Sequence, residues 1–149
     1  TVCPDRLYMG QKDFQQAMIV QQLIKIRELK TKLEVCSIVR EKDGLAMSSR
    51  NVRLDKASRT LALELSKTLN YLKRIIRQDT GEDAKTLLKK AEARISKFPD
   101  VKLEYIAWRN ASTLKPVVKY NPEAEQVVLI AAFVGGVRLI DNMLVNPKS

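Results

Sequence analysis

The first forty residues pass from an extended apolar segment to a helical one and back, and this order restricts the fold more than any other feature. Leu7-Tyr8-Met9 predicts a strand that ends at Gly10. From Asp13 to Leu29 apolar residues recur with helical spacing, and Leu33 to Val39 predicts a second strand. A strand, a helix and a strand in this order form the βαβ unit of a parallel sheet.

The helix expected at 13–29 has a broad apolar surface. Its main stripe and the residues that widen it are Phe14, Ala17, Val20, Ile24, Ile19, Leu23 and Ile26. A helix of this kind is covered on more than one side, as in an α/β layer. One βαβ unit cannot bury both faces of its sheet, so we expect these residues to be the last piece of a larger doubly wound domain whose beginning is missing.

A different pattern begins near residue 54. Helices are predicted from about Asp55, with Leu61, Leu65, Leu69, Leu72 and Ile76 on one face, and from Asp83 to Lys97, with Leu87, Ala91, Ile95 and Phe98 facing inward. Strands are predicted at 101–109, 127–134 and 137–140, and Gly135-Gly136 suits a hairpin turn with positive φ. We therefore expect an incomplete domain at 1–53 and, at 54–149, a small α+β domain with two helices and a three-stranded antiparallel sheet.

The net charge of +10 permits two interpretations. A nucleic-acid-binding protein gathers Lys and Arg on one face and supplies aromatic residues for stacking. Here the basic residues are interleaved with acids, and only eight aromatic residues occur. A solvated basic surface that attracts anionic substrates is the favoured interpretation, with no nucleic-acid partner. A non-enzymatic basic interaction domain, with nucleic-acid binding as one form of it, is the alternative.

Residue types limit the chemistry and the location. Histidine is absent, which excludes His-based catalysis and the commonest zinc sites within this chain, and we predict no metal site. Cys3 and Cys36 lack metal-site spacing and are expected to be reduced, partly buried thiols of a cytoplasmic protein. No apolar run is long enough to cross a bilayer, so no membrane partner is expected. The remaining inventory of Lys, Arg, Ser, Asp, Gln and backbone amides suits phosphate binding.

The segment Gly10-Gln-Lys-Asp-Phe-Gln-Gln16 lies where the first strand is predicted to pass into the helix. Unsatisfied N–H groups and the helix dipole favour anions at such a junction. Gly10 permits close backbone approach, Lys12 adds a mobile positive charge, and Asp13 can cap the helix or favour its positive end. Taken alone, the segment also fits an ordinary strand-to-helix junction.

Met47-Ser-Ser-Arg50 follows a glycine-containing polar loop. Two hydroxyls and a guanidinium within so short a stretch can hold several phosphate oxygens, and a mobile loop of this composition can close over a triphosphate. Taken alone, it fits a surface turn with Ser caps equally well.

Together the two segments resemble pantothenate synthetases (pantoate–β-alanine ligases). The markers are the segment at 10–16, Val-Arg-Glu-Lys-Asp-Gly-Leu-Ala-Met-Ser-Ser-Arg-Asn at 39–51, the distance between them, and Leu-Ile-Asp-Asn at 139–142. The resemblance covers essentially the whole chain. It is strong in residues 4–54 and at 138–142, and weak in the helical region between these two parts. It implies that 1–53 is the end of a Rossmann-like nucleotide-binding domain.

The resemblance also implies an ATP-dependent ligase with a pantoyl-adenylate intermediate, and ATP, pantoate and β-alanine as its substrates. By the family's pattern, the ATP site is lined by Gly10, Gln11, Lys12, Asp13, Val39, Met47, Ser48, Ser49 and Arg50. The charged and hydroxyl groups expected to act in catalysis are Lys12, Ser48, Ser49 and Arg50. Gln16 would hydrogen-bond pantoate, and Val39 would contact adenine through its backbone.

Several features depart from the family's pattern. Gln11 stands where Glu is commoner, and Cys36-Ser37 replaces the usual Val-Pro or similar pair. The histidine segment, the acids that bind Mg²⁺ and another pantoate-binding Gln would all precede Thr1. We therefore expect Mg²⁺ ligands to lie outside this chain and the isolated chain to be inactive. The full-length parent is expected to be a homodimer.

Overall fold

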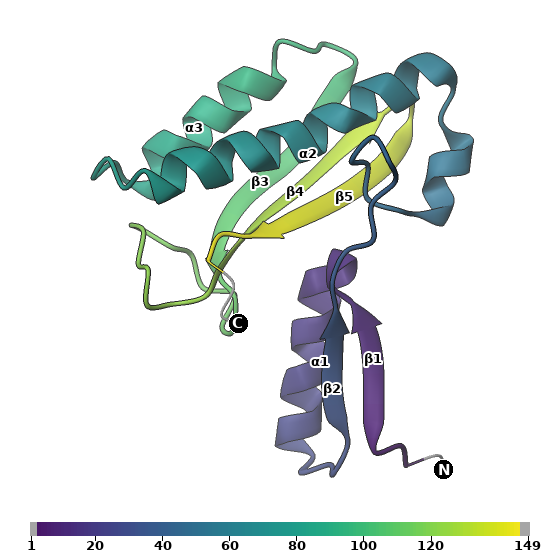
Figure 1. Ribbon diagram of the computed structural model, residues 1–149, viewed down its shortest axis with the longest axis vertical. Helices are drawn as coiled ribbons and strands as arrows, with labels where there is room; N and C mark the ends of the chain where they lie inside the picture. Colours follow the sequence, from purple (N-terminus) through teal and green to yellow (C-terminus); the bar gives the residue numbers. More distant parts are fainter. Residues whose placement is uncertain (1–2, 147–149) are drawn as a thin grey trace. The chain divides into compact units, whose positions relative to one another are not determined.

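The computed structural model describes residues 3–146, which fall into two compact units, Thr1–Val39 and Arg40–Ser149 (Figure 1). We call them the first and the second unit and describe each by itself. Residues 40–53 group with the second unit, although the sequence assigns them to the first domain. The division between family domains at residue 53 stays a prediction.

The first unit is a βαβ unit, as predicted. Strand β1 (Arg6–Gly10) leads through the short 3₁₀ helix η1 (Gln11–Asp13) into helix α1 (Phe14–Ile26), and strand β2 (Lys32–Cys36) returns parallel to β1. The helix ends earlier than Leu29 because Glu28 adopts a left-handed conformation with φ of 50°. The second strand is also shorter than predicted.

Few side chains of the first unit are buried. Phe14, Ala17 and Met18 are its buried hydrophobic residues among those the structure describes. On the same helix, Ile19 and Ile26 are 61% and 75% exposed, and Tyr8 on β1 is 63% exposed. Cys3 and Cys36 are also exposed, so the expected partial burial of these thiols is wrong. Two strands and one helix offer too little surface to cover these side chains.

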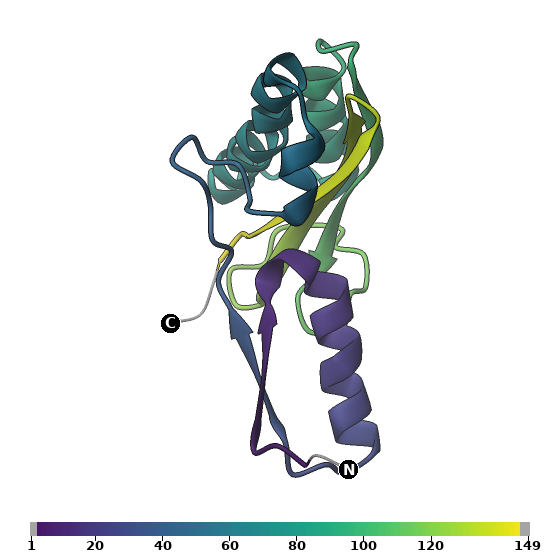
Figure 2. The same ribbon diagram turned by 90° about the vertical axis from the view of Figure 1, so that its right-hand side faces the viewer.

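The second unit pairs two helices with an antiparallel sheet. After the 3₁₀ helix η2 (Ser49–Arg53) come α2 (Lys56–Arg77) and α3 (Ala84–Ile95), then strands β3 (Val101–Asn110), β4 (Gln126–Val134) and β5 (Val137–Leu144). The sheet order is β3-β4-β5, and both helices pack on one face of it (Figures 1 and 2). This confirms the predicted α/β class, with a parallel pair and then two helices and three antiparallel strands.

Aspartate caps fix the beginnings of both helices. The side chain of Asp55 accepts a hydrogen bond from the Ser58 N–H at 2.7 Å, and Asp83 accepts one from the Thr86 N–H at 2.7 Å. The bonds from Ser58 lower the pKa of Asp55, and those from Thr86 lower the pKa of Asp83. Both helices thus begin where the sequence predicts.

The core lies between the helices and the sheet. Leu65, Leu69, Leu72 and Ile76 bring one face of α2 to it and are at most 1% exposed. From the sheet, Ile130 and Trp108 are similarly inaccessible, and the indole N–H of Trp108 donates to Gln126. The face of α2 predicted from leucine spacing is therefore the face that packs.

Two irregularities shape the sheet. Gly135 and Gly136 form the tight turn between β4 and β5 with φ of 55° and 74°, so the predicted positive-φ hairpin is confirmed. In β3 the pairing with β4 shifts between Leu103 and Tyr105, which leaves Glu104 as an extra residue.

No helix among residues 3–146 is long and apolar enough to span a membrane.

Candidate functional site

The first candidate segment lies at the junction of β1 and α1. Gly10 ends the strand, and η1 carries Gln11, Lys12 and Asp13 into the helix. Lys12 is half-buried, whereas Gln16 in the first turn of α1 is exposed. Gly10 has φ of −75°, and a Cβ placed on it would meet none of the described atoms within 4 Å. The backbone at Gly10 is therefore open to a ligand, as expected, but its conformation does not itself require glycine.

Asp13 occupies the N-cap position of α1 without capping it by its side chain. Of the two roles expected for this residue, the side-chain hydrogen bond is absent in the structure. The negative charge in the turn before the helix is present.

Val39, the last residue of the first unit, has a side chain that is 66% exposed.

The second candidate segment is the loop of residues 40–53, which borders a hollow of about 780 Å³. The hollow is lined by Arg40, Glu41, Lys42, Met47, Ser48, Ser49, Asn51 and Val52. Three of the predicted ATP-binding residues, Met47, Ser48 and Ser49, thus share one cavity wall. Arg50 is exposed and is not among the lining residues.

Ser48 caps the short helix η2. Its hydroxyl oxygen accepts a hydrogen bond from the Arg50 N–H at 3.2 Å. The interpretation of this segment as a turn with a Ser cap is therefore correct for Ser48. A hydroxyl that accepts a backbone N–H can still donate its own proton, so the cap leaves Ser48 able to bind an anion.

Asn51 joins the two ends of the loop. It is 9% exposed, and its Nδ2 donates to Glu41 Oε1 at 2.9 Å and to the Ala46 carbonyl at 3.1 Å. Its Oδ1 is buried without a hydrogen-bond partner among the described residues. The oxygen itself is inaccessible, so it is an acceptor left over for a buried water.

The loop also carries residues that sequence reasoning assigned no role. Arg40 forms an ion pair with Asp141 on β5, and Arg59 on α2 bonds to Glu41 and Asp43. One sequence signal was available. Asp141 follows Val137 and Leu139 at strand spacing, so it falls on their buried face, where a carboxylate requires a partner.

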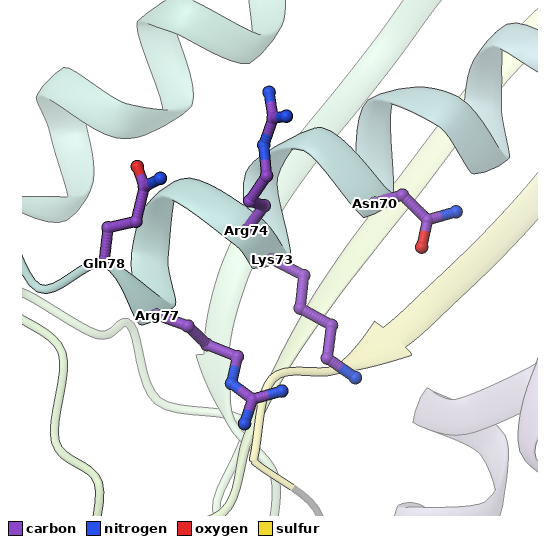
Figure 3. Close-up of a pocket in the computed structure, with 5 residues that line it drawn as sticks. All are labelled: Asn70, Lys73, Arg74, Arg77 and Gln78. Atoms are coloured by element: carbon purple, nitrogen blue, oxygen red, sulfur yellow. The ribbon is translucent and has the colours of Figure 1, made fainter.

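A second hollow, of about 370 Å³, lies along the last turns of α2 (Figure 3). Its lining residues are Asn70, Lys73, Arg74, Arg77 and Gln78. Partial burial, and secondly the charge of Arg77, lower the pKa of Lys73. Positive charges near a helix C-terminus also complement the helix dipole, so this cluster has a structural explanation.

No group of three or more His, Cys, Asp or Glu side chains among residues 3–146 is arranged to hold a metal ion. The resemblance implies a magnesium ion whose ligands are expected to lie outside this chain. We assign no metal ligand to these residues and derive no step through the metal.

Comparisons with known proteins agree with the resemblance. A family model described as pantoate-beta-alanine ligase matches residues 1–144. The pantothenate synthetase of Caldicellulosiruptor bescii is 40% identical over 99% of this chain and 51% of its own length. That of Caldicellulosiruptor saccharolyticus is 43% identical over 97% of this chain and 50% of its own. The chain thus spans about half the length of the curated relatives it matches.

Solved structures show the same similarity. A crystal structure of pantothenate synthetase from Thermus thermophilus is 31% identical, with a TM-score of 0.86, and the match covers 97% of this chain and 51% of that one. The pantoate-beta-alanine ligase from Francisella tularensis, complexed with beta-gamma ATP and beta-alanine, is 32% identical with a TM-score of 0.61, over 97% of this chain and 45% of that one.

Proposed function

Because the chain belongs to the pantoate-beta-alanine ligase family, we propose that it is the C-terminal portion of a cytoplasmic ligase that joins pantoate to β-alanine. In the first step the pantoate carboxylate attacks the α-phosphate of ATP, and pyrophosphate leaves. In the second step the β-alanine amine attacks the acyl carbon of pantoyl adenylate, and AMP leaves. The full-length protein is proposed to be a homodimer.

The hollow beside the loop of residues 40–53 is the observation that carries this proposal. It gathers Met47, Ser48 and Ser49 on one wall, in the segment by which the chain resembles the family. Ser48 keeps a proton to donate after capping η2, which suits a phosphate oxygen. The complex of the Francisella relative with beta-gamma ATP and beta-alanine supports the choice of ligands.

We assign the remaining roles as follows. Lys12 neutralises phosphate charge from the strand-to-helix junction, assisted by Gly10, Gln11 and Asp13. Arg50 reaches the phosphates from the loop, and the Val39 backbone contacts adenine. Gln16 hydrogen-bonds pantoate. Fixed positive charge is most effective where negative charge grows in the transition state, so Lys12 and Arg50 contribute to the rate of adenylation as well as to ATP affinity.

Pantoate-dependent exchange of pyrophosphate into ATP by the full-length protein tests the first step. Lys12→Ala is expected to lower the exchange rate roughly 10²–10³-fold, by analogy with the loss of one oxyanion donor. Lys25→Ala, at an exposed position on α1, is the matched control and leaves the rate unchanged. Arg50→Lys recovers only part of the loss caused by Arg50→Ala, because an ammonium cannot reproduce the guanidinium fork.

Gln16→Ala tests the pantoate assignment separately. It is expected to raise the KM for pantoate and to leave the KM for ATP nearly unchanged. A full-length protein without exchange activity would overturn the proposed function, and an effect of Gln16→Ala on ATP alone would overturn this residue's role. The isolated chain is expected to form no AMP from the three substrates and to gain activity when the other half of the protein is added.

A further inference from the structure

Arg40 and Asp141 form a two-pronged ion pair that ties the beginning of the loop to strand β5. Arg40 Nη1 lies 2.7 Å from Asp141 Oδ2, and Nη2 lies 2.9 Å from Oδ1. The Asp141 side chain is 3% exposed. The paired residues are 101 positions apart in the sequence, so this contact exists only in the folded second unit. Bidentate pairing fixes the direction of the guanidinium as well as its distance.

The same guanidinium holds two backbone carbonyls. Arg40 Nη1 donates to the Gly44 carbonyl at 3.1 Å, and Nη2 donates to the Asn142 carbonyl at 3.4 Å. One side chain therefore joins the tight turn of the loop to the outer edge of β5. The turn itself has Gly44 at φ of 94°, and the Gly44 N–H donates to the Glu41 carbonyl at 2.8 Å.

From Arg40 the contacts continue to the turn that carries Ser48 and Arg50. Arg40 and Ala46 pair as an isolated β-bridge, and the Ala46 carbonyl accepts a hydrogen bond from Asn51 at 3.1 Å. Asn51 belongs to η2, directly after Arg50. A second support comes from α2, where Arg59 Nη2 lies 2.7 Å from Glu41 Oε2 and 2.8 Å from Asp43 Oδ2.

We propose that Asp141 is a positioning residue, which holds the Ser48–Arg50 turn in place through Arg40. The inference rests on the proposed function for the identity of the ligand, but the support itself is a property of the second unit. It also gives a role to the Leu-Ile-Asp-Asn segment at 139–142. Asp141 touches no substrate in this scheme. It orients Arg40, whose bonds to the Gly44 and Asn142 carbonyls and whose bridge to Ala46 set the loop.

Asp141→Asn removes the charge and one of the two acceptor oxygens while keeping the size of the side chain. Glu104→Gln is the matched control, since Glu104 pairs with Arg138 at 2.6 Å on the same sheet, outside the residues that line the hollow. Amide hydrogen exchange of the full-length protein is the first measurement. We expect exchange at 46–51 to accelerate about 10-fold or more in the Asp141 variant, as a locally opened segment does, and to stay unchanged in the Glu104 variant.

Steady-state kinetics supply the second measurement. We expect Asp141→Asn to raise the KM for ATP and to lower adenylation by about 10- to 100-fold, because a displacement of about 1 Å is enough for such losses. The KM for pantoate should stay unchanged. A purely structural role would lower kcat through a smaller folded fraction and leave every KM unchanged, and that outcome would overturn the proposal.

Arg40→Gln is the second variant, used with the same readouts if Asp141→Asn does not fold, because the Arg40 side chain is 26% exposed and less sensitive to replacement. Unchanged exchange at 46–51 in the folded variant would overturn the proposal even if the protein proved to have another activity. Faster exchange there, in a full-length protein that does not adenylate pantoate, would support the positioning role of Asp141 and overturn only the proposed function.

Discussion

The two units of this chain solve the problem of apolar burial differently. In the second unit the helices cover one face of the sheet, and Leu65, Leu69 and Trp108 are at most 2% exposed. In the first unit one helix packs on two strands, and Ile19, Leu23 and Ile26 on α1 remain 49–75% exposed. The buried core of the βαβ unit is therefore limited to Phe14, Ala17 and Met18, because a larger core needs further covering layers.

The largest expected difference between the units comes from truncating a leucine in each. Leu69→Ala is expected to cost about 2–5 kcal/mol of unfolding free energy, because it leaves a cavity beneath α2. Leu23→Ala on α1 changes a 49% exposed side chain and should cost less than about 0.5 kcal/mol. Urea unfolding followed by the fluorescence of Trp108, the single tryptophan, and by circular dichroism checks both. Equal losses would contradict the contrast.

A pair of glycines gives the next largest contrast. At Gly135, φ is 55°, and a Cβ would lie 2.8 Å from Ser58 Cβ and also collide with its hydroxyl. Gly135→Ala is therefore expected to cost about 1–3 kcal/mol. Gly10→Ala adds a methyl group in open space at an ordinary φ and should leave stability unchanged. Thermal unfolding measures both, and a loss at Gly10 equal to that at Gly135 would show that the backbone of the first unit is also constrained.

The N-cap residues of the two units should affect stability at low pH differently. The pKa of Asp55 is lowered in the folded chain by its hydrogen bonds from Ser58, so its contribution to stability is present above its ordinary pKa of about 3.9 and lost as the pH falls below that value. Asp55→Asn keeps an oxygen that can accept the cap hydrogen bond but removes the titratable carboxyl group. It should therefore flatten the dependence of Tm on pH between about 5 and 2. Asp13→Asn is the control, since Asp13 makes no side-chain cap. An equal flattening of the pH dependence by both substitutions would contradict the difference between the two N-cap residues.

The smallest expected effect concerns Lys73 in the hollow on α2. Burial, and secondly Arg77, lower its pKa, so the charged form is less favoured in the folded chain than in the unfolded chain. Lys73→Gln should raise the unfolding free energy, within about 0.5 kcal/mol. The gain should disappear as the pH rises past the ordinary lysine pKa of about 10.4. Lys25→Gln on α1 is the matched change, and a larger gain there would contradict the burial argument.

Local signals in the sequence predicted much of the fold. Asp55 and Asp83 mark helix beginnings, and Gly135-Gly136 marks the hairpin, because each acts on neighbouring residues alone. The last strand continues to Leu144 rather than ending at Ile140. Its apolar alternation is broken by Asp141, a residue that the strand accommodates only because Arg40 neutralises it.

The candidate site was less accessible to sequence reasoning. The segment at 47–50 could be picked out by its hydroxyl and guanidinium groups. Its support could not, because Arg40 finds Asp141 and Arg59 finds Glu41 only after β5 and α2 have packed. Nor does the sequence show that the Ser48 hydroxyl is already engaged as a cap.

The extra residue in β3 changes what insertions and deletions can do to this sheet. Before the bulge Val101 and Leu103 face the helices, and after it Ile106 and Trp108 do, so Glu104 and Tyr105 lie together on the opposite face. Deleting Glu104 would leave Leu103 opposite Ala132 and Tyr105 opposite Ala131, so regular pairing and regular alternation of faces would follow, with Val101 and Trp108 both still facing the helices. Glu104 therefore adds one position to the outer face of β3, where it pairs with Arg138, and the residues of β3 that face the helices would keep their places without it.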